Sequence, residues 1–407
     1  MNLQNLLNAT PQEKFLKDIL GKECHVVRGD DDRFVDLLPW EELNRILATH
    51  RFEAPRIRLF KDDRPVLPSV YNPEVASYPE RPAFSWQRHR RLNVSSVVSA
   101  LQDGATLRIA AVDELYEPIG HLAAAIENSV RERVYASAFL CWGNTGAFSR
   151  HWDDNDALVL QIAGKKHWDL YGSTYPWPGY QDRTVVDSRP PSDEPEQVIL
   201  TAGDVLYVPQ GCWHRVIPDD DMSLHISFGF TGRNGHDFLE WAIEDFRKSV
   251  AVCRQRLPRH HTSKQLGGHI ELLSKEFLKH LERDGLSDRF LAEYSADQPT
   301  RTGFSLPGAV GWSASHDEHP ELAIFWLAPL CAMNREGSQI VVLTNGQKYD
   351  FPEEYRPLLN ILVSEIKSSF GELFRAGEKV NLSRGKVDSF VWQLVRLGLA
   401  SCAQEVS

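Results

Sequence analysis

Two histidines and one aspartate have the types and the spacing of a metal-binding set. His151 and Asp153 lie two positions apart, and His214 ends a later block that begins with Gly203-Asp204. Side chains at positions i and i+2 of a β-strand project to the same side, so His151 and Asp153 could reach one metal ion from one strand. Two imidazoles and a carboxylate can occupy one face of an octahedral Fe(II) ion and leave the other face open for an oxidant and a chelating co-substrate. We therefore predict that these three residues are the metal ligands and the catalytic centre.

Alternatives to this prediction remain open in the sequence. A lone His-x-Asp occurs often by chance, but here it is joined by a distant block with a Gly-Asp turn, an apolar run, a second turn and then His214. The same donor set binds Mn(II), Ni(II) and Zn(II), so the sequence does not single out iron. In a purely structural interpretation, Asp153 caps a turn and both histidines are ordinary polar residues. That interpretation requires several independent elements to coincide by accident.

Lys166 is a candidate for binding an anion. It lies in the alternating segment 166–171, where it shares a face with Trp168 and Leu170. If that face is the interior of a barrel, a buried ammonium costs several kcal/mol unless it meets an anion. The alternative is a surface lysine that extends its amino group into solvent, as we expect for its neighbour Lys165.

The segment 223–230 alternates between an apolar face and a face of small polar residues. Leu224, Ile226, Phe228 and Phe230 share one side, whereas His225 and Ser227 lie on the other. A small polar face suits a buried co-substrate pocket, and we predict that His225 and Ser227 contribute to it. His225 could instead orient another side chain or be a satisfied core histidine.

Composition is that of an ordinary globular protein. The chain has 407 residues, enough for two or three domains, and contains neither a long apolar run nor a recognisable signal peptide. Its six cysteines form no C-x-x-C pair, so we expect neither a zinc knuckle nor a disulfide framework and predict a reducing, cytoplasmic location. The net charge of −11 argues mildly against general nucleic-acid binding.

The pattern of elements predicts an α+β chain with three parts. Helical segments are expected within residues 1–50 and at 121–133, and strands at 55–60 and 106–110. From 134 to 230, short strands separated by Gly, Pro and Asp turns are typical of a double-sheet jelly roll. A helical hairpin follows, and its second helix carries a near-heptad apolar stripe that could pack on the barrel or on a second copy of the chain. The stripe consists of Leu266, Ile270, Leu273, Phe277 and Leu281.

Residues from 303 onward look like a separate small α+β unit. We expect a strand at 339–343, a hairpin turn at Asn345-Gly346, and amphipathic helices at 358–370 and 383–399. A winged-helix-like module fits this order. Acidic residues outnumber basic ones in this part of the chain, so we expect a structural or protein-contact role and no direct DNA binding.

The metal motif and the segment that follows it, from His151 to Trp168, are similar to the JmjC/cupin dioxygenases, and especially to the ribosomal oxygenases and their bacterial relatives. The resemblance covers about 52–230 and continues more weakly to the C-terminus. It implies a double-stranded β-helix catalytic domain at 1–235, a helical dimerisation domain at 236–302 and a winged-helix-like domain at 303–407. It also implies Fe(II), O₂ and the co-substrate 2-oxoglutarate, with Lys166 on the distal carboxylate and His225 and Ser227 lining the pocket.

The resemblance implies hydroxylation of a protein side chain, a histidine or an arginine of a ribosomal protein, by a homodimer. A biosynthetic peptide or a small metabolite is the alternative acceptor. A non-catalytic JmjC-like regulator is a further alternative, but it would be favoured by a broken ligand set or a missing basic residue, and neither is seen. One departure concerns Phe139, which stands where several relatives have a tyrosine that helps to hold the co-substrate.

Overall fold

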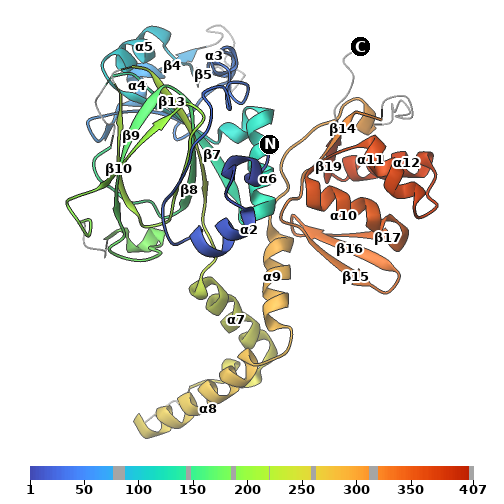
Figure 1. The fold of residues 1–407 in the computed structure, drawn as a ribbon. Helices are drawn as coiled ribbons and strands as arrows, with labels where there is room; N and C mark the ends of the chain where they lie inside the picture. The colour runs from blue at the N-terminus through green and yellow to red at the C-terminus, as the bar shows by residue number, and fades with distance from the viewer. Residues whose placement is uncertain are drawn as a thin grey trace. The chain divides into compact units, whose positions relative to one another are not determined.

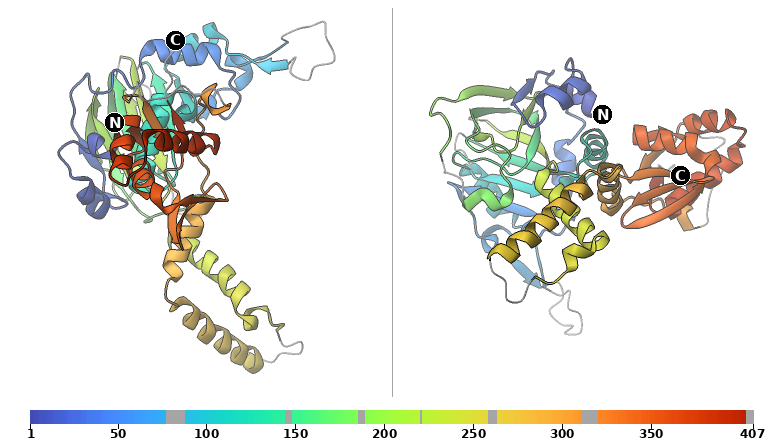
Figure 2. Two further views of the ribbon diagram at one scale, coloured as in Figure 1. Left: turned by 90° about the vertical axis from the view of Figure 1, so that its right-hand side faces the viewer. Right: turned by 90° about the horizontal axis from the view of Figure 1, so that it is seen from below.

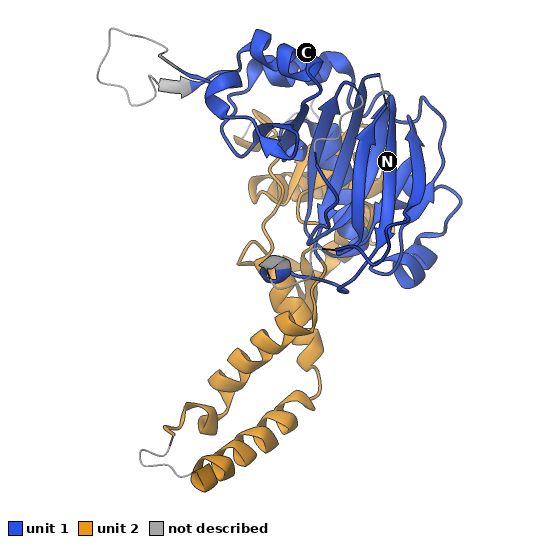
Figure 3. Cartoon of the chain, turned by 90° about the vertical axis from the view of Figure 1, so that its left-hand side faces the viewer, with its two compact units in different colours: residues 1–231 blue, residues 232–407 orange. Residues whose placement is uncertain are grey.

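The computed structural model describes residues 1–76, 88–143, 148–184, 189–219, 221–257, 263–310 and 320–402. The chain forms two compact units, residues 1–231 and residues 232–407 (Figure 3). Among the described helices, none combines the length and the apolar character that crossing a membrane requires. The prediction of three domains with boundaries at 235 and 302 stays a prediction.

Unit 1 is built on an eight-stranded sheet that faces a three-stranded sheet (Figure 1). The larger sheet has the order β1-β11-β8-β13-β7-β6-β2-β3, and the smaller one has the order β10-β9-β12. All the neighbouring strands in both sheets are antiparallel, as in the predicted jelly roll. Their bounds are β1 His25–Val27, β2 Ile57–Lys61, β3 Arg64–Pro65, β6 Thr106–Ala110, β7 Val134–Cys141, β8 Asp156–Ala163, β9 Lys165–Gly172, β10 Glu196–Thr201, β11 Val205–Val208, β12 Trp213–Pro218 and β13 Ser223–Phe230.

The two faces of the larger sheet pack against different parts of the unit. Its outer face is apolar and packs into a core with the N-terminal helices, because alternate residues of each strand, such as Leu158, Ile226 and Phe228, point to that side. A second, smaller apolar cluster lies between the two sheets and includes Val159, Trp168 and Leu200. Since a one-residue slip would turn the outer-face residues inward, the apolar face fixes the register of the whole sheet.

Gly164 lets the chain pass from one sheet to the other. It joins β8 of the larger sheet to β9 of the smaller one, with a φ of +68°. A β-carbon at this position would lie 1.9 Å from the carbonyl oxygen of Met222, so a side chain cannot be accommodated without moving the backbone. This turn sets the direction of β9 and therefore the position of Lys166.

The helices of unit 1 cover one side of the larger sheet. Several of their bounds differ from the predicted ones. The helices are α1 Leu3–Leu7, α2 Gln12–Lys14, a π-helix Phe15–Ile19, α3 Trp40–Thr49, α4 Pro68–Tyr71, α5 Val94–Gln102 and α6 Glu117–Val130. The helix expected at 121–133 begins at Glu117 and ends at Val130, because the next residue, Arg131, is left-handed. Residues 1–50 are not all helical, because β1 pairs with β11. The short strands β4 Glu74–Ala76 and β5 Arg88–Arg90 pair with each other.

Unit 2 begins with the predicted helical hairpin and a third helix. The elements are α7 Gly235–Ser249, a 3-10 turn Ala251–Arg254, α8 Ser263–Leu281 and α9 Leu286–Asp297. Helices α7 and α8 lie side by side (Figure 2). Helix α9, whose bounds the sequence pattern did not predict, packs against the strand β16 Gln339–Thr344.

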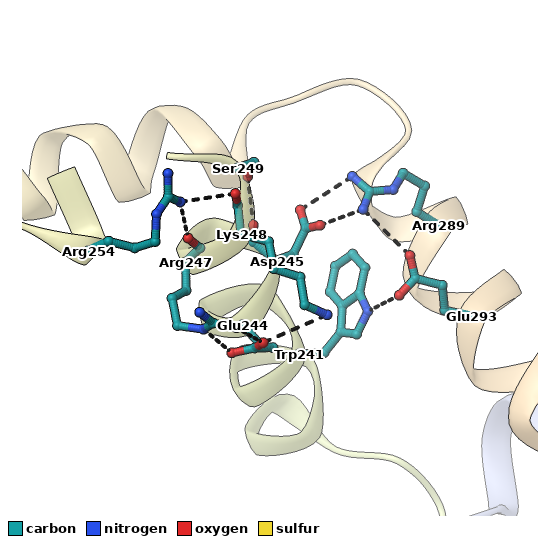
Figure 4. Close-up of polar contacts among 9 residues, drawn as sticks. All are labelled: Trp241, Glu244, Asp245, Arg247, Lys248, Ser249, Arg254, Arg289 and Glu293. Atoms are coloured by element: carbon teal, nitrogen blue, oxygen red, sulfur yellow. Dashed lines mark hydrogen bonds and ion pairs between the residues drawn. The ribbon is translucent and has the colours of Figure 1, made fainter. Parts of the chain in front are cut away.

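An ion-pair network joins α7 to α9 (Figure 4). The guanidinium of Arg289 donates to both carboxylate oxygens of Asp245, at 2.5 and 3.3 Å, and lowers the pKa of that carboxyl. Glu293 accepts from the indole of Trp241 at 2.8 Å, while His280 of α8 lies 3.1 Å from Asp245. Arg289 and Glu293 are exposed, whereas Trp241 and Asp245 are half-buried and His280 is buried. We expect the contacts of the exposed side chains to contribute little to the stability of the fold.

In the described residues that follow α9, unit 2 has two three-stranded sheets and three α-helices. The sheets have the orders β18-β14-β19 and β15-β16-β17. The bounds are β14 Ala323–Trp326, β15 Ala332–Glu336, β17 Gln347–Pro352, α10 Arg356–Glu365, β18 Lys367–Ser369, α11 Phe370–Glu378, α12 Arg384–Arg396 and β19 Ala400–Cys402. The predicted turn at Asn345-Gly346 is confirmed, with positive φ at both residues.

One helix prediction in this region was wrong. The helix expected at 358–370 ends at Glu365, because Ile366 has a φ of +61°. A new helix then begins at Phe370, capped by Ser369, whose hydroxyl accepts from the amide of Glu372. The winged-helix character of this region stays a prediction.

Candidate metal centre and its pocket

The three predicted ligands lie together at the mouth of the jelly roll. His151 and His214 form an isolated antiparallel bridge, with main-chain N–H···O distances of 3.0 and 2.8 Å. The carbonyl of Asp153 accepts from the amide of Gly211 at 2.9 Å, so the segment that carries Asp153 is tied to the turn before His214. The ligand atoms of His151, Asp153 and His214 lie within 4.8 Å of one another.

The expectation that His151 and Asp153 share a regular strand was wrong. Only His151 takes part in a bridge, and β8 begins three residues after Asp153. Main-chain hydrogen bonds at His151 and Asp153, both to the segment 211–214, nevertheless keep the two side chains on one side. The spacing therefore predicted the juxtaposition, although the element is a bridged loop.

Hydrogen bonds leave one nitrogen of each imidazole directed to the site. The Nδ1 of His151 lies 2.9 Å from the carbonyl of Ser149, and the Nδ1 of His214 lies 3.0 Å from the carbonyl of Cys212. If each Nδ1 carries the proton and donates to its carbonyl, each Nε2 has a free lone pair. The Nε2 of His214 is 3.7 Å from a carboxylate oxygen of Asp153. This donor set fits a divalent transition-metal ion such as Fe(II).

Burial keeps His214 in the form that binds metal. Desolvation, followed by the effect of neighbouring His151, lowers the pKa of His214 to about 4, while Asp153 raises it in part. The imidazole of His214 is therefore neutral at physiological pH, and a metal ion need not displace a proton from its Nε2.

A cavity of about 430 Å³ adjoins the three ligands and runs between the two sheets. Pockets of this size are typical of small-molecule sites. Its walls come from both sheets and include His151, Asp153, Lys166, His214, His225 and Ser227, the six residues singled out from the sequence. The structure thus brings all six to one pocket, and their individual roles remain predictions.

Lys166 faces the interior, as its alternation suggested. It is 2% exposed, and its ammonium donates to the Nδ1 of His225 at 2.6 Å. Burial lowers the pKa of Lys166, and burial together with the nearby ammonium lowers the pKa of His225 well below its ordinary value. His225 is therefore a neutral acceptor. Among the described residues, no carboxylate pairs with Lys166, so the ammonium is held ready for an anion.

Phe139 lies against this pair. It is the cross-strand partner of His225, and the two rings stack with centroids 4.8 Å apart and planes at 16°. The phenyl ring closes the side of the pocket where a tyrosine would have placed a hydroxyl group. Ser227, on the same face of β13, also lines the cavity.

Arg108 and Tyr135 are among the pocket residues that sequence reasoning missed. Arg108 lines the cavity from β6, and burial lowers the pKa of its guanidinium. Tyr135 lies across Gly229, where a β-carbon would come within 2.6 Å of the ring, and its hydroxyl donates to Asn155 at 3.0 Å. A signal for Arg108 was present, because a charged residue stood in the alternating segment 106–110.

Comparisons with known proteins agree with this geometry. Residues 114–238 match the JmjC domain family. The chain is 27% identical over 214 residues to the "Bifunctional lysine-specific demethylase and histidyl-hydroxylase NO66" of Drosophila grimshawi, covering 51% of this chain and 27% of that protein. It is 32% identical over 174 residues to "Ribosomal oxygenase 1" of Gallus gallus, covering 41% of this chain and 28% of that protein. The chain thus spans about a quarter of the length of these curated relatives.

The fold is shared with a solved bacterial protein. The structure of ycfD from Escherichia coli matches with a TM-score of 0.58 and 17% identity, over 97% of this chain and 99% of that one. The same protein, described as a ribosomal oxygenase, has also been solved in complex with cobalt and 2-oxoglutarate, and that structure matches with a TM-score of 0.56. These likenesses show the jelly-roll core with its helices.

Metal binding is predicted to depend on each of the three ligands. His151→Ala, Asp153→Ala and His214→Ala should each reduce Fe(II) affinity by at least about a hundred-fold, because a lost ligand costs more than a lost supporting hydrogen bond. Anaerobic titration followed by calorimetry measures this effect, and circular dichroism checks the fold. His167→Ala is the matched control, because His167 is half-exposed and does not line the pocket. Unchanged affinity in all three variants would exclude the metal site.

Proposed function

We propose that this JmjC-domain protein, which is similar to the ribosomal oxygenases, is an Fe(II)- and 2-oxoglutarate-dependent oxygenase that hydroxylates a protein side chain. The observation that carries the proposal is one pocket that holds both a His-Asp-His donor set and a buried lysine without a carboxylate partner. A metal site alone would suit many functions. The added cation selects a co-substrate that chelates the metal at one end and bears a carboxylate at the other.

His151, Asp153 and His214 would hold the metal from one side. Bound Fe(II) would supply the activation of O₂ that is coupled to conversion of 2-oxoglutarate to succinate and CO₂. The Nδ1 hydrogen bonds to the carbonyls of Ser149 and Cys212 orient both imidazoles, and burial favours the neutral form of His214. It also surrounds the site with apolar and aromatic walls, which limit the access of water.

Lys166, His225 and Ser227 would bind the distal end of 2-oxoglutarate. The ammonium of Lys166 is already desolvated, so its attraction for a carboxylate is not screened by water. Neutral His225 holds the ammonium through its Nδ1, and Ser227 adds a hydroxyl group on the same inner face. Because Phe139 has no hydroxyl, Lys166 would carry most of the attraction for this carboxylate.

The substrate we favour is a histidine or arginine side chain of a ribosomal protein. This preference rests on the names of two relatives, one a histidyl-hydroxylase and the other a ribosomal oxygenase. A biosynthetic peptide or a small metabolite remains the alternative acceptor. The non-catalytic alternative is not supported, because the donor set and the buried lysine are both present.

Two linked measurements test the function. Protein with Fe(II), ascorbate and 2-oxoglutarate should release succinate, and the release should increase with a ribosomal-protein fraction. Mass spectrometry of that fraction should show a gain of one oxygen atom on a histidine or an arginine. His214→Ala is the inactive control. Succinate release without any oxidised ribosomal protein would leave an oxygenase with another acceptor, and no release under any condition would refute the proposal.

Lys166→Ala is predicted to separate co-substrate binding from metal binding. Removal of one partner from a desolvated charge pair typically costs roughly 2–5 kcal/mol, so 2-oxoglutarate affinity should fall about thirty-fold or more. Metal affinity should be unchanged, because Lys166 is not among the donor atoms. Lys165→Ala, at the exposed neighbouring position, is the control. Equal co-substrate affinity in Lys166→Ala and the wild type would place the anion elsewhere.

The pH dependence of the same binding provides a second readout. Burial lowers the pKa of Lys166, and the ammonium is the form that binds. Affinity for 2-oxoglutarate should therefore be complete below that pKa and decline as the pH rises through it. Lys166→Arg should recover part of the affinity and remove the decline, because a guanidinium remains protonated.

We further propose that α7 and α8 mediate a homodimer. Helix α8 has one buried residue, His280, and several large apolar side chains of the hairpin are uncovered. Of the predicted stripe, Phe277 packs on Phe246 with ring centroids 5.2 Å apart, whereas Ile270 is 52% exposed. The uncovered set comprises Leu239, Ile243, Ile270, Leu272 and Leu278. A two-fold interface would bury the same face in both copies.

Ile270→Glu is predicted to convert the dimer to a monomer at micromolar concentration, because the interface would bury an unpaired carboxylate in each copy. Multi-angle light scattering after size exclusion gives the mass directly. Lys275→Glu introduces the same charge at an exposed polar position of α8 and should leave the dimer intact. A monomeric wild-type protein would contradict the proposal.

A further inference from the structure

A second cationic site lies on the inner face of the larger sheet. Arg108 lines the cavity, and Arg58 stands directly opposite it in the register of β2 and β6. Cross-strand partners in an antiparallel pair project to the same face, so the two guanidinium groups are neighbours. Like charges in this arrangement repel each other unless an anion lies between them or nearby.

The hydrogen bonds of Arg108 are incomplete. One terminal nitrogen donates to the hydroxyl of Ser137 at 3.3 Å, and the guanidinium lies 5.8 Å from the ring centre of Phe139. Its Nε is buried and has no hydrogen-bond partner. Neither Arg108 nor Arg58 forms an ion pair within the part of the chain that the structure describes. A buried donor without an acceptor is costly, and the residue that carries this one lines the cavity.

Phe139 separates this site from the co-substrate site. The phenyl ring stacks on His225, which accepts from Lys166, and Arg108 lies on the β6 side of the same ring. The distal carboxylate of 2-oxoglutarate would neutralise Lys166 only. Asp153 would be engaged as a metal ligand, so it would not serve as the partner of Arg108. The pocket thus retains a cation that the proposed co-substrate and metal do not satisfy.

We propose that Arg108, supported by Arg58, binds a carboxylate of the hydroxylation substrate and so determines specificity. This inference rests on the proposed oxygenase function, and it adds a requirement for the acceptor. A guanidinium offers several N–H donors in a planar fork that matches a carboxylate, and the unsatisfied Nε is one of them. The acceptor would bear this carboxylate within a few bonds or residues of the carbon to be oxidised.

The requirement divides the possible acceptors. An acidic residue beside the target, or a free α-carboxylate at a chain end or in a small metabolite, would complete the site. A target flanked only by lysine and arginine would place further positive charge beside Arg58 and Arg108, which opposes binding. Specificity would then come from both an attraction and a repulsion at the same position.

Three small probes test the site directly. N-acetylglutamic acid α-amide carries only a side-chain carboxylate, N-acetylglutamine carries only an α-carboxylate, and N-acetylglutamine amide is neutral. Each is titrated calorimetrically into full-length protein loaded with Zn(II) and saturating 2-oxoglutarate, so that turnover is prevented and Lys166 is occupied. We expect at least one charged probe to bind about ten-fold or more tightly than the neutral one. Which charged probe binds distinguishes an internal acidic residue from a free α-carboxylate.

Variants assign that binding to the arginines. Arg108→Gln should reduce the affinity for the charged probe about ten-fold or more, to the level of the neutral probe, and Arg58→Gln should reduce it less. Arg64→Gln, at an exposed position of β3, is the matched control and should have no effect. Arg108→Gln and Arg58→Gln should both keep wild-type affinity for 2-oxoglutarate.

The outcomes separate this inference from the proposed function. Equal binding of charged and neutral probes, no saturable binding at millimolar concentration, or charged-probe binding that survives Arg108→Gln would overturn the inference. A loss of 2-oxoglutarate affinity in Arg108→Gln would also overturn it, because Arg108 would then be a co-substrate residue. A wild-type protein that binds neither metal nor 2-oxoglutarate would refute the proposed function instead.

Discussion

The main-chain pairing of His151 with His214 is the contact on which the site depends. Its two hydrogen bonds join a loop to the first residues of β12, and they do so without any side chain. A third main-chain bond, in which the amide of Gly211 donates to the carbonyl of Asp153, ties Asp153 to the turn before His214. The donor atoms are therefore brought together by the backbone, and a metal ion would enter a site that is already assembled. Preorganisation of this kind avoids the entropic cost of ordering ligands on binding.

The polar interior is possible because the outer face of the same sheet holds the register. Every second residue of β7, β8 and β13 is buried in the outer core, so a slip of one residue would expose that core and is strongly disfavoured. The inner positions are then free to carry polar groups that would be poor choices for stability. Lys166 and Arg108 are two such groups, and both line the cavity. Lys166 is buried, and the Nε of Arg108 has no hydrogen-bond partner. Burying these charged groups costs free energy, and a bound anion that pairs with them would offset that cost.

The sequence predicted what depends on local spacing and alternation, and it failed where distant segments meet. The jelly roll, the inward direction of Lys166 and the gathering of His151, Asp153 and His214 all followed from periods of two and from turn residues. The regular strand through Asp153 was wrong, because pairing with a distant turn replaces the ladder there. The helix bound at Glu365 was missed, because the left-handed conformation of Ile366 has no signature in its residue type. Arg108 was overlooked although its charge stood out in an alternating segment, and the missing partner of its Nε is seen only in the packed structure.

The division of the chain into two units has an evolutionary consequence. Every residue that lines the metal pocket belongs to residues 1–231, whereas the uncovered apolar side chains of α7 and α8 belong to residues 232–407. Mutations that alter the chemistry and mutations that alter the uncovered helical surface therefore fall in different stretches of the gene. Recombination near the boundary could exchange one stretch while leaving the other intact. A lineage could in this way keep its catalytic residues while the helical surface changes. Sequence divergence between relatives would then differ between residues 1–231 and residues 232–407.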